Sequence, residues 1–210
     1  MAGEDVKARA SDALMALAAE KDFARIALSE VAARAGIGGA DLRREFDGTL
    51  DILAAFSQRI DERVLAGTGE DMDDEPARER LFDVMMRRFD HLRPHREGLR
   101  SVMRALSRDP VMLARWNRTA LVTATWMLDA ARIDATGLAG AARAQGLAIA
   151  FGRVMRTFLA DDDPGMARTM SELDRRLREG ERALGMASRL VRFACRPLRF
   201  RRTAPARSPA

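Results

Sequence analysis

The stretch that decides the fold reads LSEVAARAGIGGADLRREF and covers residues 28–46. Its apolar residues recur at intervals of three and four up to Ala35, which is the pattern of a short helix with one buried face. Gly36 suits the left-handed conformation that ends a helix. After two more glycines, Leu42 and Phe46 form the apolar face of another short helix, which the next Asp-Gly pair closes. The sequence therefore predicts two short helices joined by a tight turn.

Helical patterns continue on both sides of this stretch. An apolar stripe from Val6 to Ala18 predicts a helix before it, and another helix starts near Thr49. Asp109 and Asp163 each precede a proline, which is a preferred start of a helix. Further helices are expected at residues 81–89, 99–106, 110–133, 138–159 and 164–184. Helix formers dominate the composition and Tyr is absent, so we expect an all-α protein of about nine helices.

Charge divides the chain into three parts. Residues 1–66 contain 9 Lys+Arg and 12 Asp+Glu, residues 67–188 contain 20 and 19, and residues 189–210 contain 7 Arg and no acid. The excess of basic residues that gives the chain its net charge of +5 therefore lies at the C-terminal end. The acidic stretch 70–75 has no apolar stripe and is interpreted as a solvated linker. We expect a head at 1–66, a body at 67–188 and a basic tail at 189–210.

Four short motifs of the head resemble, in order and spacing, those of the TetR family of transcriptional regulators. They are residues 20–23, 28–32, 35–37 and 42–46. The resemblance implies a TetR-like all-α fold, with a three-helix helix-turn-helix head and a bundle of about six helices. It also implies a homodimer in which a small molecule bound in the body changes the spacing of two DNA-reading heads. The positions that match DNA contacts are Gly38, Gly39, Asp41, Arg43, Arg44 and Thr49.

Arg43 and Arg44 are the main candidates for reading bases. An arginine on a recognition helix can pair bidentately with guanine and discriminate by roughly 1–3 kcal/mol. The alternative interpretation is an ordinary solvated helix face. Asp41, Glu45 and Asp47 lie in or beside the same helix. These acids oppose DNA binding, because neutralisation of phosphates by basic residues supplies most non-specific affinity for DNA.

The body carries a second resemblance, in residues 92–97, 108–110, 126–128 and 169–177. These stretches are similar to the ubiquinone-biosynthesis accessory proteins that share the TetR fold. The resemblance implies binding of an isoprenoid lipid without DNA binding. The alternative function is therefore a lipid-binding accessory protein of quinone metabolism.

Methionine and aromatic residues are frequent in the body, and methionine adapts to irregular apolar ligands. We expect an apolar pocket between helices, although plain core packing is the alternative for each residue. The pocket candidates are Met85, Phe89, Met103, Trp116, Trp126 and Met127. The helices at 138–159 and 164–184 are the expected dimer pair, and the family resemblance favours an interface over packing within one chain. The interface candidates are Leu147, Phe151, Val154, Phe158, Met170, Leu173 and Leu177.

In the tail, apolar residues alternate with arginines over residues 189–202. This composition is typical of a segment that contacts anionic lipid at a membrane surface. A solvated disordered tail and a non-specific DNA clamp are the alternatives.

Catalytic and metal-binding patterns are weak. His91 and His95 are separated by Pro94, and no partner has the spacing of a metal ligand. No glycine-rich phosphate loop follows a strand, and Cys195 lacks a paired base. We therefore expect no enzyme, cofactor or metal. A single cysteine and an acidic, polar N-terminal start favour the cytoplasm.

Overall fold

The computed structural model describes residues 2–67 and 74–194, and its side chains are described for residues 3–67 and 74–183. Within these ranges the chain is all-helical, which confirms the predicted fold class. The helices are α1 (Ala2–Glu20), η1 (Phe23–Arg25), α2 (Leu28–Ala35), α3 (Gly39–Glu45), α4 (Thr49–Ala66), α5 (Ala77–Leu92), η3 (Arg93–His95), α6 (Arg96–Arg108), α7 (Pro110–Ala130), α8 (Gly137–Leu159) and α9 (Ala167–Ala194), η1 and η3 being 3₁₀-helices.

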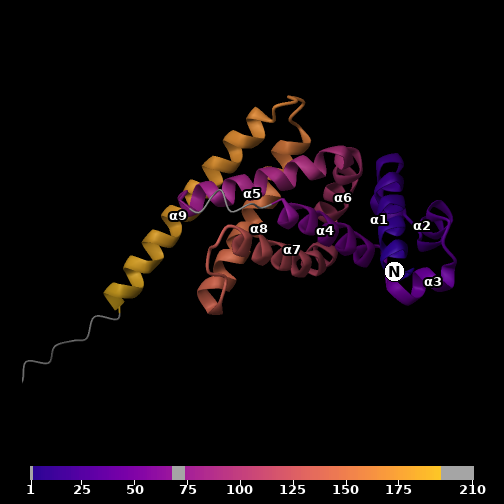
Figure 1. The fold of residues 1–210 in the computed structure, drawn as a ribbon, viewed down its shortest axis with the longest axis horizontal. Helices are drawn as coiled ribbons and strands as arrows, with labels where there is room; N and C mark the ends of the chain where they lie inside the picture. Colours follow the sequence, from indigo (N-terminus) through magenta and orange to yellow (C-terminus); the bar gives the residue numbers. More distant parts are fainter. Residues whose placement is uncertain (1, 68–73, 195–210) are drawn as a thin grey trace, which may run out of the picture.

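The head consists of α1, α2 and α3, which lie together at one end of the molecule (Figure 1). Helix α2 ends at Gly36, whose φ of 62° is left-handed as predicted. The Ile37 N–H donates to the Ala32 carbonyl at 3.0 Å, which closes the turn. Leu42 and Phe46 are buried against the head core. The chain thus turns sharply between α2 and α3, and α3 is held by its apolar face.

The body is built from α4 to α9, and α9 extends past the other helices at its C-terminal end (Figure 1). Helix α4 packs against α1 of the head and against α5 and α7 of the body. Helix α6 also packs against α1. At Gly98 this approach is so close that an added Cβ would lie 2.7 Å from the Met15 carbonyl oxygen. The head is therefore joined to the body mainly through α4 and α6, with a smaller contact from η3.

A buried hydroxyl reinforces the contact between α6 and the head. Ser101 Oγ accepts from the Phe23 N–H at 2.8 Å and donates to the Lys21 carbonyl at 2.9 Å. Both Ser101 and Phe23 are buried. The hydroxyl therefore satisfies backbone groups that water does not reach.

The start of the last helix differs from the prediction. Helix α7 begins at Pro110 as expected, but α9 begins at Ala167, three positions after Pro164. Asp163 accepts from the backbone N–H groups of Gly165 and Ala167, and Asp161 accepts from the N–H of Thr169 at 2.8 Å. Because these carboxylates hold the chain in a turn, the helix cannot start at the proline.

Helix α9 continues to Ala194, beyond the end predicted at residue 184 and into the predicted basic tail. Cys195 and the rest of the tail lie outside the described residues, as do residues 68–73, which include the first part of the predicted linker at 70–75. In the described part of the chain, no helix has the length and apolar character needed to cross a bilayer. The predicted lipid contact at residues 189–202 stays a prediction.

Candidate nucleic-acid interface and ligand cavity

Helix α3 presents its polar face to solvent. Leu42 on its inner face and Phe46 just beyond its end are buried, whereas the side chains of Arg43 and Arg44 are 69% and 74% exposed. Two anchored apolar residues thus fix the orientation of the helix, and two arginines on the opposite side point away from the core.

Both arginines contact an acidic side chain. Arg43 forms an ion pair with Asp47, and Arg44 Nη2 lies 2.8 Å from Asp41 Oδ1. Exposed ion pairs one helical turn apart are worth about 0.3–0.5 kcal/mol. A guanine contact worth roughly 1–3 kcal/mol exceeds this stabilisation. The acids therefore lower the positive charge of the surface but do not lock the arginines in place.

The other predicted DNA-contact positions flank the two arginines in the chain. Gly38 precedes the first turn of α3 in an extended conformation. At Gly39, no atom of the described residues lies within 4 Å of an added Cβ, so the surface there is open. Thr49 is the first residue of α4 and is half-buried. These positions are compatible with contact to DNA, which stays a prediction.

The body contains a small apolar cavity between α4, α5, α7 and α8. Its volume is about 40 Å³. The lining residues are Ser57, Met85, Arg88, Trp116, Ala120, Thr123, Ala124, Met127, Leu147, Ala148 and Phe151. Three predicted pocket residues, Met85, Trp116 and Met127, are therefore placed together.

The remaining pocket candidates do not line this cavity. Phe89 is buried behind it and stacks on Phe151, with ring centroids 5.1 Å apart. Met103 is half-buried on α6, outside the lining. Trp126 is 51% exposed on α7. For Met103 and Trp126 the prediction is corrected, because α6 does not border the cavity and the Trp126 side chain is exposed on α7.

A buried charged network forms one wall of the cavity, and the sequence prediction missed it. Arg88 of α5 is 3% exposed and pairs with Asp61 of α4, which is also buried. Arg88 Nη2 donates to Ser57 Oγ at 2.9 Å, and the Thr123 hydroxyl donates to Asp61 Oδ2 at 2.8 Å. The Arg88 guanidinium also lies over the Phe151 ring, 5.4 Å from its centroid.

Burial alters the chemistry of Arg88. Loss of hydration lowers the pKa of Arg88 to about 9, so the guanidinium is still charged at neutral pH. Its Nε has no hydrogen-bond partner among the described residues. Because removing a charge from water is costly, a buried pair with an unsatisfied donor is weak evidence for stabilisation.

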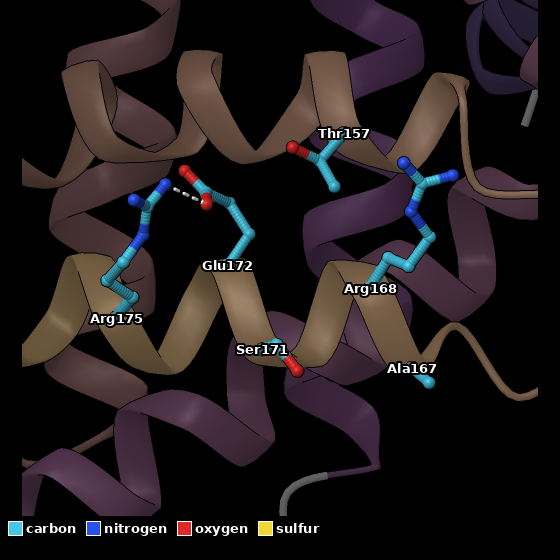
Figure 2. A pocket seen from close by; sticks show the side chains of 6 residues that line it. All are labelled: Thr157, Ala167, Arg168, Ser171, Glu172 and Arg175. Atoms are coloured by element: carbon cyan, nitrogen blue, oxygen red, sulfur yellow. Dashed lines mark hydrogen bonds and ion pairs between the residues drawn. The ribbon is translucent and has the colours of Figure 1, made fainter.

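A second hollow is a surface groove between α8 and the start of α9 (Figure 2). Figure 2 shows Glu172 and Arg175 meeting in the space between the two helices, with Thr157 facing them from α8. The groove is about 480 Å³ and is lined mainly by polar and charged side chains. It is open to solvent and does not offer the enclosed site between helices expected for the ligand.

Most residues predicted for the dimer interface lie in the core of the protomer instead. Met170 is 41% exposed on α9, and Phe151 is half-buried at the cavity. The buried members are Leu147, Val154, Phe158, Leu173 and Leu177. Their stripe packs α8 and α9 into the same chain, so these five cannot meet a second copy directly.

His95 takes part in packing at the junction of head and body. Its ring contacts Phe56 edge-on, with centroids 4.8 Å apart. Burial lowers the pKa of His95, against the opposing effect of Asp12, and the charges of Arg59 and Arg63 lower it further. Among the described residues, no three His, Cys, Asp or Glu side chains are grouped so that they could hold a metal ion.

Comparison with solved structures identifies the fold of the chain. No protein-family model and no curated protein matches the chain. A TetR transcriptional regulator from Nitrosomonas europaea ATCC 19718 is 20% identical with a TM-score of 0.65, over 83% of this chain and 97% of that one. A TetR transcriptional regulator from Rhodococcus sp. RHA1 is 22% identical with a TM-score of 0.63, over 86% and 97%. The chain therefore has the fold of these regulators.

Proposed function

We propose that this protein is a dimeric transcriptional regulator of the TetR type, which binds DNA through α2 and α3 and a small-molecule effector in the body cavity. The observation that carries the proposal is the anchored helix α3 with Arg43 and Arg44 directed outward. This is the arrangement in which a second short helix enters the major groove. Two structural neighbours at 20% and 22% identity that are TetR transcriptional regulators support it.

Helix α4 provides a route between the two sites. It starts at Thr49, directly after the reading helix, and contributes Ser57 and Asp61 to the cavity region. A ligand changes the equilibrium between two conformations only if it binds them with different affinity. A ligand that moves Arg88 relative to Asp61 acts directly on α4, and the movement reaches the head through the same helix.

Exposed apolar residues on α8 and α9 are the surface that a second copy of the chain would cover. They are Leu138, Ile149 and Met170. Covering these side chains with a second copy would remove apolar surface from water, which is favourable. We therefore expect the dimer interface to be formed by these exposed residues and not by the buried residues predicted from the sequence.

Binding to DNA from around the protein's own gene, in about 150 mM salt, tests the proposal. The variant Arg43→Ala/Arg44→Ala should weaken specific binding by at least about 30-fold, because two base contacts are lost. Arg104→Ala/Arg115→Ala is the control, since it removes the same charge from exposed positions elsewhere. Equal affinity of the two double variants would refute a reading role for α3.

Removal of the two acids that pair with Arg43 and Arg44 gives the opposite expectation. Asp41→Asn/Asp47→Asn should raise DNA affinity, because Arg43 and Arg44 then reach the bases without a competing carboxylate and the head carries two fewer negative charges near the phosphates. An unchanged affinity would show that neither arginine approaches DNA.

The lipid-binding accessory protein is the second candidate function. It is favoured by the pairing of both outward arginines with acids and by the excess of 12 acidic over 9 basic residues in the head. Solvent extraction of the purified protein followed by mass spectrometry tests it. A co-purifying isoprenoid lipid, together with absence of specific DNA binding, would replace the regulator proposal.

A further inference from the structure

The cavity combines an apolar lining with one unsatisfied donor. Met85, Trp116 and Met127 are among its apolar lining residues. On the same wall, Arg88 is 3% exposed and its Nε lacks a hydrogen-bond partner among the described residues. An unpaired buried N–H is unfavourable, and a ligand that accepts a hydrogen bond removes this cost. The ligand should therefore carry an acceptor atom.

The charge of the wall restricts the ligand further. Arg88 and Asp61 form an ion pair, so together they carry no net charge. An anionic ligand would bring an uncompensated negative charge into an apolar cavity, and a cationic ligand would meet the guanidinium. Burying an unpaired charge is much more costly than burying a neutral polar group. The ligand is therefore uncharged.

The hydroxyl groups around the pair leave little room for additional polar contacts. Ser57 Oγ accepts from Arg88, and Thr123 Oγ1 donates to Asp61. The cavity volume is about 40 Å³, which is less than a six-membered ring needs. A single ring enters only when the flexible side chains of Met85 and Met127 change conformation and enlarge the cavity.

We propose that the cavity binds a small uncharged molecule with an apolar body and one carbonyl-type oxygen, which accepts a hydrogen bond from the Arg88 guanidinium. The idea that this molecule is an effector rests on the function proposed above. The inference that the cavity binds it does not depend on that function. A hydrocarbon of the same shape leaves the Arg88 donor unpaired, and a carboxylate of similar size adds a buried charge. The cavity should discriminate against both.

Three ring compounds test this discrimination directly. Cyclohexanone carries the carbonyl, methylenecyclohexane has the same shape without an acceptor oxygen, and cyclohexanecarboxylate carries a charge at neutral pH. The fluorescence of Trp116 reports binding, because its side chain lines the cavity. Trp126→Phe removes the other tryptophan, which is 51% exposed and outside the lining. Dissociation constants are measured in the full-length Trp126→Phe protein, used as the reference.

A variant pair separates the hydrogen bond from general apolar affinity. Arg88→Met alone would leave Asp61 as a buried unpaired charge, so the folded test protein is Arg88→Met/Asp61→Leu, in which apolar groups replace both members. The matched control is Arg78→Met/Asp174→Leu, which removes a half-exposed pair with atoms 3.7 Å apart on α5 and α9. Circular dichroism and thermal unfolding establish that both variants are folded.

The preference for ketone over hydrocarbon is the decisive quantity. It should be at least about tenfold smaller in Arg88→Met/Asp61→Leu than in the reference protein, and unchanged in the control, as expected for loss of a hydrogen bond to a charged donor. Cyclohexanecarboxylate should bind the reference protein at least about tenfold more weakly than cyclohexanone. An equal preference in all three proteins, tightest binding of the carboxylate, or no binding of any probe would overturn the proposal.

The outcome is independent of DNA binding. A protein that binds cyclohexanone as described but no specific DNA would refute the regulator function and leave the cavity assignment intact. A protein that binds its own upstream DNA but none of the probes would refute the cavity assignment and leave the proposed DNA binding intact.

Discussion

Replacing Ser101 with alanine tests how the head is attached to the body. The Ser101 hydroxyl accepts from the Phe23 N–H at 2.8 Å and donates to the Lys21 carbonyl at 2.9 Å. Ser101 and Phe23 are each 1% exposed. Water therefore cannot replace the hydroxyl, and Ser101→Ala leaves the Phe23 N–H unsatisfied.

The expected magnitude follows from this burial. An unsatisfied buried donor costs about 1–3 kcal/mol. The higher helix propensity of alanine offsets at most about 0.5 kcal/mol in α6. We expect the free energy of unfolding to fall by about 2 kcal/mol, which corresponds to a decrease in Tm of about 4–8 °C for a chain of this size.

Urea denaturation followed by circular dichroism at 222 nm measures this loss. Ser107→Ala is the matched control in the same helix, because its hydroxyl donates to the Arg104 carbonyl at 2.8 Å on the exposed surface. Water replaces that bond, so the control should stay within about 0.5 kcal/mol of wild type. Equal effects of the two alanines would refute the idea that Ser101 holds the head through a buried hydrogen bond.

Three further predictions concern the same core. Gly98→Ala should lower the free energy of unfolding by about 1–3 kcal/mol, because its Cβ would lie 2.7 Å from the Met15 carbonyl oxygen; an unchanged Tm would contradict this. Asp61→Leu and Arg88→Met should each cost about 3–5 kcal/mol by leaving one buried charge, whereas the double variant should be close to wild type. Additive losses in urea titrations would exclude this coupling. Burial lowers the pKa of His95, so protons bind the unfolded chain first as pH falls below 6.5. The free energy of unfolding should therefore decrease below that pH and level off below the folded-state pKa of His95. His95→Gln should reduce the slope of the free energy of unfolding against pH, measured by urea titration over that range. An identical slope in the variant would argue against His95 as the cause.

The head could be predicted from sequence because its signals are local. Gly36 ends α2 in the left-handed conformation, and Leu42 and Phe46 face the core as their spacing indicates. The start of α9 could not be predicted in this way. The Asp163–Pro164 pair has the form of a helix start, but the hydrogen bond from Thr169 to Asp161 holds the chain in a turn first.

The packing around the body cavity was predicted incompletely, for a related reason. The apolar stripe of α8 was identified, but periodicity does not tell whether Val154 and Phe158 face the same chain or a second copy. Asp61 and Arg88 occupy positions within the apolar stripes of α4 and α5. A charged residue at such a position is the available signal for the network, yet its partner becomes visible only when the two helices are packed together.

The position of the Arg88–Asp61 pair gives the proposed mechanism a physical basis. The two long body helices that contact α1 of the head are α4 and α6, and the short η3 also touches it. Helix α6 is fixed there by the Ser101 hydrogen bonds, whereas α4 carries Asp61 in the cavity wall. A ligand that competes for the Arg88 guanidinium weakens the hold of α5 on α4 but leaves the attachment of α6 unchanged. Since packed helices move as rigid units, the response in this mechanism is a displacement of α4 relative to α6, which tilts the head that both of them support.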